Sequence, residues 1–504
     1  MAFEENNFNV AKKLTLEKKE FNVECNVLPG DNVQKVLVTA VDACVLNYEV
    51  YNGGINFSGN IDVKVVYLCD DGQINTVNAT CPFSSKFEGD DIEVGQSAVL
   101  SVKVVDYNYE NANNDNLKLN VTLLQSGFVT FNKDIHAIDS HNPDVCCKYE
   151  EVFLPKFLVC GEETFNEESE TLLREKIKKV VLVQSKVLTK DVSAGVNFVS
   201  VSGEIAVKVL YVNENDKIES GYIYDTFKEE VEIQGVSQDS FVEARSSVCQ
   251  DGVNTEIVED EKGCKLLIKT PLHVEVCAYG KEKVLVVKDL YSTENELNVT
   301  TASFEMTNIS PMEIVEGKIE GSLTLGEDSP RVDKIIMYGG DDVVITNNYT
   351  NDGEVFVEGI ARTNVVYLND DENALHSIQL DIPFTISNRT NFPDGGTLVV
   401  DAALSDVDVS VRKGREILFD GKVKASVNQY FEENSAVISE ANDGEVYPPK
   451  DYSMEVVFVK GGSDLWEVAK YCKVKENQVL TQNPDVVFPL LDDTSLVLFY
   501  QKLN

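Results

Sequence analysis

The 504-residue sequence lacks long apolar runs and carries little positive charge. No stretch approaches the roughly 18 uninterrupted apolar residues that a membrane-spanning helix needs. Lysine and arginine together number 44 against 85 acidic residues, which gives a formal net charge of −41. An acidic surface repels phosphate backbones and anionic lipids. The composition therefore predicts neither nucleic-acid binding nor membrane insertion.

Secretory and redox signals are also missing. The start, Met1-Ala2-Phe3-Glu4-Glu5, has neither the basic region nor the apolar core of a signal peptide. The eleven cysteines are scattered without CxxC pairs, a pattern typical of reduced, mostly buried thiols. From these absences we expect a cytoplasmic protein.

The sequence contains none of the motifs that would indicate a common catalytic site. GxxxxGK[ST], GxSxG and HExxH do not occur. Only four histidines are present, none spaced i, i+4, and the spacing of His141, Cys146, Cys147 and Cys160 matches no usual zinc ligand pattern. We therefore expect no enzymatic activity, no cofactor and no metal site.

Three acidic runs invite a calcium hypothesis: Asp70-Asp71, Asp341-Asp342 and residues 369–372. None has the register of an EF-hand loop, and two follow a tyrosine-ended strand where a hairpin turn belongs. Turn chemistry is the simpler interpretation, although sequence alone leaves calcium binding open.

One template occurs three times in the first 440 residues. It consists of a lysine-led apolar strand, a glycine 24 or 25 residues later, a tyrosine eight residues after the glycine, and a phenylalanine 16 or 17 residues after that. Four markers in one register three times indicate domain-sized repeats. The copies are Lys35, Gly59, Tyr67 and Phe83; Lys179, Gly203, Tyr211 and Phe227; and Lys334, Gly359, Tyr367 and Phe384.

Period-two alternation, abundant valine, threonine and aromatic residues, and turns such as Asn52-Gly53 predict antiparallel sheets in each repeat. A β-sandwich is the natural closure for such sheets. We therefore predict a mainly β protein of three tandem sandwich-like domains, with linkers near 140–165, 292–312 and 440–451. The predicted domains are residues 17–150, 160–295 and 312–443, followed by a small domain at 452–504.

The repeats resemble the SPOCS domain, a spore-coat-associated family of endospore-forming bacteria. The central strand Gly59-Asn60-Ile61-Asp62-Val63-Lys64-Val65-Val66-Tyr67 and the later Pro82-Phe83 carry the likeness. The second repeat departs from it with Thr226 in place of the proline, and the third with Thr363-Asn364 in the strand centre.

The last fifty residues predict a βααβ unit. A strand at 456–459 is followed by the turn Lys460-Gly461-Gly462-Ser463, a helix capped by Asp464 with Glu467 three residues later, a short second helix, and the strand 496–499. Leu465, Val468, Ala469 and Cys472 form one apolar stripe on the first helix. The unit resembles the LysM domain, which binds glycans or, in some families, proteins.

The two resemblances together imply a structural adaptor in spore coat assembly, on the mother-cell side at the forespore surface. Its LysM-like domain would bind the polymerising coat morphogenetic ATPase, and its β domains other coat proteins. The alternative is a binder of peptidoglycan or another N-acetylglucosamine polymer. The likeness places recognition on two converging loops, with these candidates: Gly461, Gly462, Ser463, Asp464, Trp466, Val487, Phe488 and Leu490.

Within that candidate site, three apolar residues could instead fill the core of the module. We favour a core role for Leu490, weigh core and contact about evenly for Phe488, and note that Trp466 could pack inward. Lys460, Lys470, Lys473 and Lys475 add local positive charge that could steer an acidic protein partner.

Overall fold

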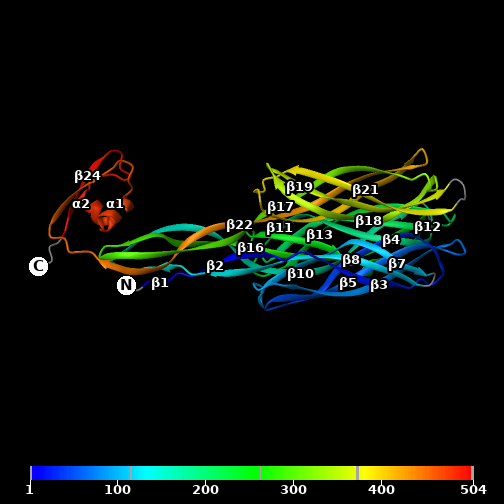
Figure 1. The fold of residues 1–504 in the computed structure, drawn as a ribbon, viewed down its shortest axis with the longest axis horizontal. Helices are drawn as coiled ribbons and strands as arrows, with labels where there is room; N and C mark the ends of the chain where they lie inside the picture. Colours follow the sequence, from blue (N-terminus) through cyan, green and yellow to red (C-terminus); the bar gives the residue numbers. More distant parts are fainter. Residues whose placement is uncertain (1–2, 114–115, 174, 261–262, 370–373, 501–504) are drawn as a thin grey trace.

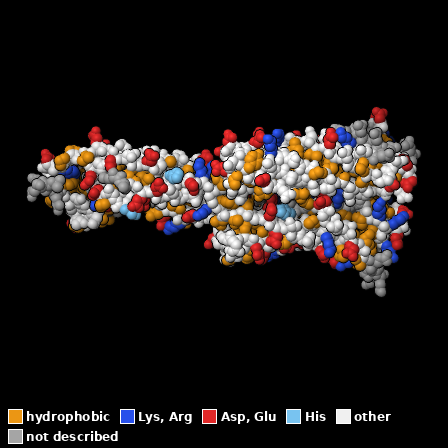
Figure 2. Space-filling view, turned by 90° about the horizontal axis from the view of Figure 1, so that it is seen from below, with side chains coloured by type: hydrophobic (Ala, Val, Ile, Leu, Met, Phe, Trp, Pro, Cys, Tyr) orange, Lys and Arg blue, Asp and Glu red, His pale blue; other side chains and the backbone are white. Residues whose placement is uncertain are grey.

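The computed structural model describes residues 3–113, 116–173, 175–260, 263–369 and 374–500. Antiparallel β-strands dominate these ranges, which confirms the predicted mainly β fold. The strands form a wide body at one end of an elongated molecule and a narrow stalk towards the other (Figure 1). In the face seen in Figure 2, acidic and basic side chains are interspersed along the whole length.

The body consists of three β-sandwiches, each with one sheet of three consecutive strands, which we call the inner sheet. The inner sheets are β4 (Val33–Tyr51), β5 (Gly54–Cys69) and β6 (Ile74–Glu88) in sandwich 1; β11 (Ile177–Ala194), β12 (Phe198–Asn213) and β13 (Ile218–Glu232) in sandwich 2; and β18 (Val332–Asn351), β19 (Glu354–Asn369) and β20 (Leu375–Arg389) in sandwich 3.

The second sheet of each sandwich, the outer sheet, is centred on a long strand that pairs with neighbours on both sides. The outer sheets contain β2 (Phe8–Thr15), β3 (Lys19–Val27), β7 (Ser97–Asn113) and β8 (Asn116–Ile135); β10 (Val145–Leu173), β14 (Phe241–Val248), β15 (Asn254–Asp260) and β16 (Gly263–Ser292); and β17 (Asn295–Thr324), β21 (Thr397–Arg412) and β22 (Glu416–Val446). A short turn of 3₁₀-helix, Gln250–Gly252, joins β14 to β15.

Burial alternates along these strands as the period-two pattern predicted. In β8, for example, Leu117, Leu119, Val121 and Leu123 are all fully buried in the core of sandwich 1, and the residues between them are not. Since successive side chains of a strand point to opposite faces, one set fills the space between the two sheets. Each sandwich has its own cluster of this kind.

The repeated glycine and phenylalanine are direct cross-strand partners. Gly59 pairs with Phe83, and the pairs Gly203–Phe227 and Gly359–Phe384 repeat the register. A Cβ atom at Gly59 would collide with the carbonyl oxygen of Cys44 and with the Phe83 ring, and the other two glycines are crowded in the same way. The marker position therefore requires glycine, because an aromatic ring and a neighbouring strand pack directly against its backbone.

The three sandwiches are bundled around a central axis with approximate threefold symmetry. The residue five positions after each marker glycine reaches the next sandwich: Lys64 donates to the carbonyl oxygen of Val183 at 2.8 Å, the Lys208 ammonium lies 3.9 Å from the centroid of the Tyr338 ring, and Asn364 donates to the carbonyl oxygen of Thr39 at 3.1 Å. Sandwich 1 thus contacts 2, 2 contacts 3, and 3 contacts 1. Apolar residues of all three inner sheets share one cluster on this axis.

Charged residues at equivalent positions also meet on the axis. Lys186 of sandwich 2 pairs with Asp42 of sandwich 1 and, at 3.2 Å, with Asp342 of sandwich 3. In the outer sheets, Asp401 accepts from Lys103 at 2.8 Å and from Arg245 at 3.0 Å. Burial opposes ionisation of Asp401, yet the Arg245 and Lys103 charges hold the pKa of its carboxyl well below the usual range.

The N-terminal strand β2 contributes a further buried ion pair to the axis. The Lys13 ammonium bonds to the Glu243 carboxylate at 2.6 and 2.7 Å and lies 3.5 Å from the centroid of the Phe128 ring and 4.7 Å from that of Tyr430. Both charged side chains are almost inaccessible, at 0% and 9% exposure. β2 therefore ties all three sandwiches together.

The stalk is formed by the outer strands where they run beyond the body (Figure 1). β10 pairs with β16 from Val145–Ser292 to Leu173–Cys264, and β17 pairs with β22 from Asn295–Val446 to Thr324–Glu416. Together with β2 and the end of β8 they enclose a separate apolar cluster. Short strands β1 (Glu4–Glu5) and β9 (Ile138–Asp139) pair beside it.

The linkers predicted at 140–165 and 292–312 are therefore wrong. β10 occupies the first of these ranges from Val145 onward and β17 the second from Asn295 onward, each as a continuous, paired strand. Sequence composition could not separate a linker from a strand that leaves its sandwich to build a stalk, because both lack the sandwich markers. In the third predicted linker, 440–451, residues 440–446 are the end of β22. Only residues 447–451 connect β22 to the next element.

The prediction that the cysteines are reduced is wrong for four of them. Cys44 of β4 is bonded to Cys249, which joins sandwiches 1 and 2, and Cys160 is bonded to its cross-strand neighbour Cys277. The other seven cysteines are not bonded to one another. Pairing partners that lie 205 and 117 residues apart cannot be recognised from spacing alone.

A βααβ unit, which we call the C-terminal unit, follows β22. It comprises β23 (Met454–Val459), α1 (Leu465–Cys472), α2 (Glu476–Gln482) and β24 (Thr494–Phe499), with β23 and β24 antiparallel. Its buried side chains include Val457, Val468, Ala469, Val479 and Leu496. In the described ranges, no helix has the length and apolar character required to cross a membrane.

Candidate partner-binding site on the C-terminal unit

The first helix of the unit begins as the sequence predicted. Asp464 is the N-cap and accepts a bond from the backbone N–H of Glu467 at 2.7 Å, while the Glu467 carboxylate accepts from the backbone N–H of Asp464 at 3.2 Å. This reciprocal capping box satisfies two amide donors that the helix leaves unpaired. It also holds the pKa of the Asp464 carboxyl below its usual value.

The structure brings the two candidate loops together. The backbone N–H of Gly462 donates to the carbonyl oxygen of Leu490 at 2.6 Å, and that of Leu490 donates to the carbonyl oxygen of Ser463 at 3.0 Å. The amide of Gly461 donates to the Asp493 carboxylate at 3.0 Å. Gly462 has a φ of 92°, a conformation that side chains disfavour, which explains a glycine at this turn.

Trp466 packs inward and also contacts the stalk. Its ring meets Tyr291 of β16 edge to face, with centroids 5.0 Å apart, and its indole N–H donates to the Asp289 carboxylate at 2.8 Å. Only 7% of Trp466 is exposed. The Tyr291 hydroxyl in turn donates to the carbonyl oxygen of Val474 at 2.7 Å. Trp466 therefore helps to join the C-terminal unit to the stalk.

Two of the candidate site's charged residues are engaged in the same junction. Asp464 pairs with Lys148 of β10 at 3.2 Å, and Lys470 pairs with Asp289 at 2.5 Å. Lys473 lies 3.3 Å from the centroid of the Tyr447 ring. Of the four lysines expected to attract an acidic partner, only Lys470 forms an ion pair among the residues that the structure describes.

The apolar candidates differ sharply in exposure. Leu490 is buried at 4%, Phe488 is half-buried against the core of the unit, and Val487 is 79% exposed. Leu490 thus belongs to the core, and Phe488 both packs and presents part of its ring. Val487 is the most accessible of the three.

Sequence reasoning missed several exposed apolar residues close to these loops. Leu491 is 94% exposed and Phe458 is 83% exposed. Phe458 shares one face of the small sheet with Met454 and Val456, since these three alternate along β23 and all are exposed. The available signal was the unbroken apolar run at 456–459, because a strand that packs on one face only should alternate.

Among the described residues, the metal ligands considered from sequence form no group of three that could hold an ion. Cys160 is in a disulfide, and His141 lies 3.8 Å from Glu4. Of the acidic runs, Asp342 pairs with Lys186 and Asp341 accepts a bond from Thr363 at 2.5 Å, while residues 370–373 lie outside the described ranges.

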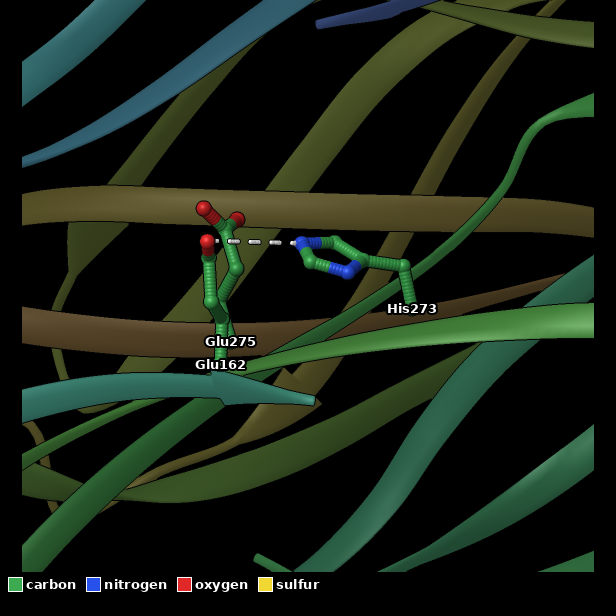
Figure 3. A group of neighbouring side chains, drawn as sticks. All are labelled: Glu162, His273 and Glu275. Carbon is green, nitrogen blue, oxygen red and sulfur yellow. Dashed lines mark ion pairs between the residues drawn. The ribbon is translucent and has the colours of Figure 1, made fainter. Parts of the chain in front are cut away.

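A different group of possible ligands does converge, on β10 and β16: Glu162, His273 and Glu275 (Figure 3). Burial, with smaller contributions from the neighbouring acids, raises the pKa of the Glu275 carboxyl to about 7 despite the Arg245 charge beside it. Burial lowers the pKa of the His273 imidazole, which favours its neutral form.

Comparison with known proteins gives a match of two segments of the chain to one family model. The search of curated proteins and the search of solved structures each found no match. Residues 32–111 and 331–412 match the family model described as SipL, SPOCS domain. These segments cover the inner sheets of sandwiches 1 and 3 together with β7 and β21. Over these two segments, the chain is therefore similar to the SPOCS domain of SipL.

Proposed function

We propose that this chain is a non-enzymatic structural adaptor in spore coat assembly. The observation that carries the proposal is the match of residues 32–111 and 331–412 to the SipL SPOCS domain, a family whose name links it to sporulation. On this proposal the protein acts on the mother-cell side of the forespore surface. The body binds coat proteins, and the C-terminal unit binds a coat morphogenetic ATPase.

The arrangement of the molecule supports a connecting role. The C-terminal unit lies at the stalk end, away from the three-sandwich body (Figure 1). The stalk has its own apolar core and paired strands, and on this proposal it would hold the two binding regions apart. Such a shape suits a protein that joins one layer of an assembly to another.

The surface of the C-terminal unit favours a protein over a glycan. Val487 and Leu491 expose apolar side chains on one of the two candidate loops, and Phe458 does so at the end of β23. Buried apolar anchors contribute most to protein interfaces, whereas sugar sites need many hydrogen-bonding groups. Lys460 adds positive charge beside the first loop.

The deciding experiment is a pull-down with the full chain, offered the purified coat ATPase in one arm and insoluble peptidoglycan in the other. We expect retention by the ATPase only. Retention by peptidoglycan alone would favour the LysM-type glycan binder, and retention by neither would count against both functions.

Variants of the second loop test where the partner binds. Phe488→Asp should abolish ATPase binding, because a charge would replace an apolar anchor at the interface. Since Phe488 is half-buried, Val487→Asp is the companion variant, and its side chain can change without disturbing the core. Leu172→Asp, an equally drastic change at a residue 61% exposed in sandwich 2, is the matched control. Wild-type binding by both loop variants would refute this location.

A further inference from the structure

Glu162, His273 and Glu275 project from one face of the β10–β16 ladder. Glu162 is directly opposite Glu275 in the register, and the next pair on the same face is Thr164 and His273. Residues two apart on a strand point the same way, so the ladder places three metal-binding side chains side by side. Figure 3 shows the three side chains turned towards one another.

The distances suit a small metal ion. One potential ligand atom of each residue lies within 4.8 Å of those of the other two, and His273 Nε2 is 3.7 Å from Glu162 Oε2. Ligand atoms about 2.0–2.2 Å from a tetrahedral zinc ion lie roughly 3.4 Å from each other. Small rotations of the two glutamate side chains would close the remaining difference.

Among the described residues, no lysine or arginine forms an ion pair or hydrogen bond with either glutamate, although the Arg245 charge lies near Glu275. Like charges directly opposite each other destabilise a strand pair. Arg245 is the other cross-strand neighbour of Glu275, but its guanidinium donates to Asp401 at 3.0 Å and to Ser101 at 2.7 Å. Among the described residues, none donates a hydrogen bond to the Glu275 carboxylate. A bound cation would relieve this repulsion.

His273 is held in the orientation that a ligand needs. Its Nδ1 lies 3.1 Å from the Thr164 hydroxyl oxygen, and its Nε2 faces Glu162. With the ring proton on Nδ1 donated to Thr164, the lone pair of Nε2 points at the carboxylates. Fixing the outer nitrogen in this way is how proteins commonly orient a metal-binding histidine.

We propose that Glu162, His273 and Glu275 bind a divalent transition metal of the zinc class, with water completing the coordination. One imidazole nitrogen and two carboxylates match the preference of zinc for nitrogen and oxygen ligands in a four-coordinate site. Calcium and magnesium fit less well, since both require six or more oxygen ligands. The ion would clamp β10 to β16 next to the Cys160–Cys277 disulfide, which lies two residues away on both strands.

Equilibrium dialysis of the chelator-treated full chain against ZnCl₂ tests the site. We expect one tightly bound zinc ion per chain, and at least tenfold weaker binding for His273→Gln. His141→Gln is the matched control, because His141 also faces a glutamate, Glu4 at 3.8 Å, but is not part of a three-ligand group among the described residues. Glu162→Gln provides a second variant at an accessible position, 61% exposed, should His273→Gln fail to fold.

The seven cysteines outside the disulfides could also bind zinc, so the ligand type must be measured. Cobalt bound to nitrogen and oxygen shows only weak visible bands, whereas thiolate ligation adds an intense near-ultraviolet band. We expect the weak bands in the wild type and their loss in both ligand variants. Absence of zinc binding, a thiolate band, or binding unchanged in folded His273→Gln and Glu162→Gln proteins would overturn the proposal.

Discussion

Lys208 offers the sharpest test of how the three sandwiches hold together. Its side chain lies on the central axis, only 3% of the residue is exposed, and its ammonium sits 4.1 Å from the centroid of the Tyr222 ring and 3.9 Å from that of Tyr338. The ammonium has no hydrogen-bond partner among the described residues. Burial lowers the pKa of Lys208 to about 8, although Asp341 opposes the change.

These values predict that Lys208→Met stabilises the protein at pH 7. The gap between a pKa of about 8 and the ordinary 10.5 corresponds to a cost of about 3 kcal/mol, since one pKa unit is worth about 1.4 kcal/mol. Attraction between the ammonium and the two rings offsets up to about 2 kcal/mol of this cost. We therefore expect a net gain of about 1–3 kcal/mol in the free energy of unfolding.

The pH dependence has a definite sign. Below pH 8 the lysine is charged in both folded and unfolded chains, so the full cost is present. Between pH 8 and 10.5 the folded protein loses the proton first, and the wild type gains stability that the variant does not. The advantage of Lys208→Met should therefore shrink as the pH rises through this window.

Urea unfolding midpoints of both proteins at pH 7, 8.5 and 10 measure the effect. Lys64→Met is the matched control from sandwich 1. Because Lys64 donates to the carbonyl oxygen of Val183, its loss should destabilise the protein by about 1 kcal/mol or more. A Lys208→Met protein less stable than the wild type at pH 7, or a difference independent of pH, would refute the reasoning.

Two further predictions concern packing elsewhere in the body. Lys13→Met should lower the free energy of unfolding by about 3–5 kcal/mol, since it leaves the Glu243 carboxylate buried without its cation. Lys12→Met, on the opposite face of β2, should lower it by no more than about 1 kcal/mol, because the partners Glu305 and Glu432 are exposed. Equal losses in denaturant unfolding would contradict this difference. Gly203→Ala should cost about 1–3 kcal/mol because a methyl group would collide with Leu188 and Phe227, while Gly221→Ala, with open space around it, should change stability by less than about 0.5 kcal/mol. Thermal unfolding of the two variants side by side would show whether the marker glycine matters for this reason.

Features set by local sequence could be predicted, whereas those set by packing between distant segments could not. Alternation along each strand predicted the sheets, and the marker spacing predicted a glycine and a phenylalanine that prove to be cross-strand partners. Asp464 and Glu467 predicted the helix cap. Each of these signals lies within about thirty residues of its partner.

The central axis, the stalk and the site near His273 depend on longer-range contacts. Nothing near Lys186 in the sequence indicates that Asp42 and Asp342 surround it. In the candidate partner site, the sequence suggested the two loops but not that Trp466 would be committed to Asp289 and Tyr291. The motif His273-Val274-Glu275 was the one local hint of a metal site, because alternate residues of a strand share a face.

The meeting of Asp42, Lys186 and Asp342 makes the three copies of the repeat non-interchangeable. An assembly of three identical chains would place the same side chain three times at such a point, so acids there would repel one another. A single chain can place a lysine between two aspartates, so that one of the two negative charges is offset. A chain in which sandwich 2 were replaced by a second sandwich 1 would bring three aspartates together, so the copy that carries the lysine is required at its own position around the axis.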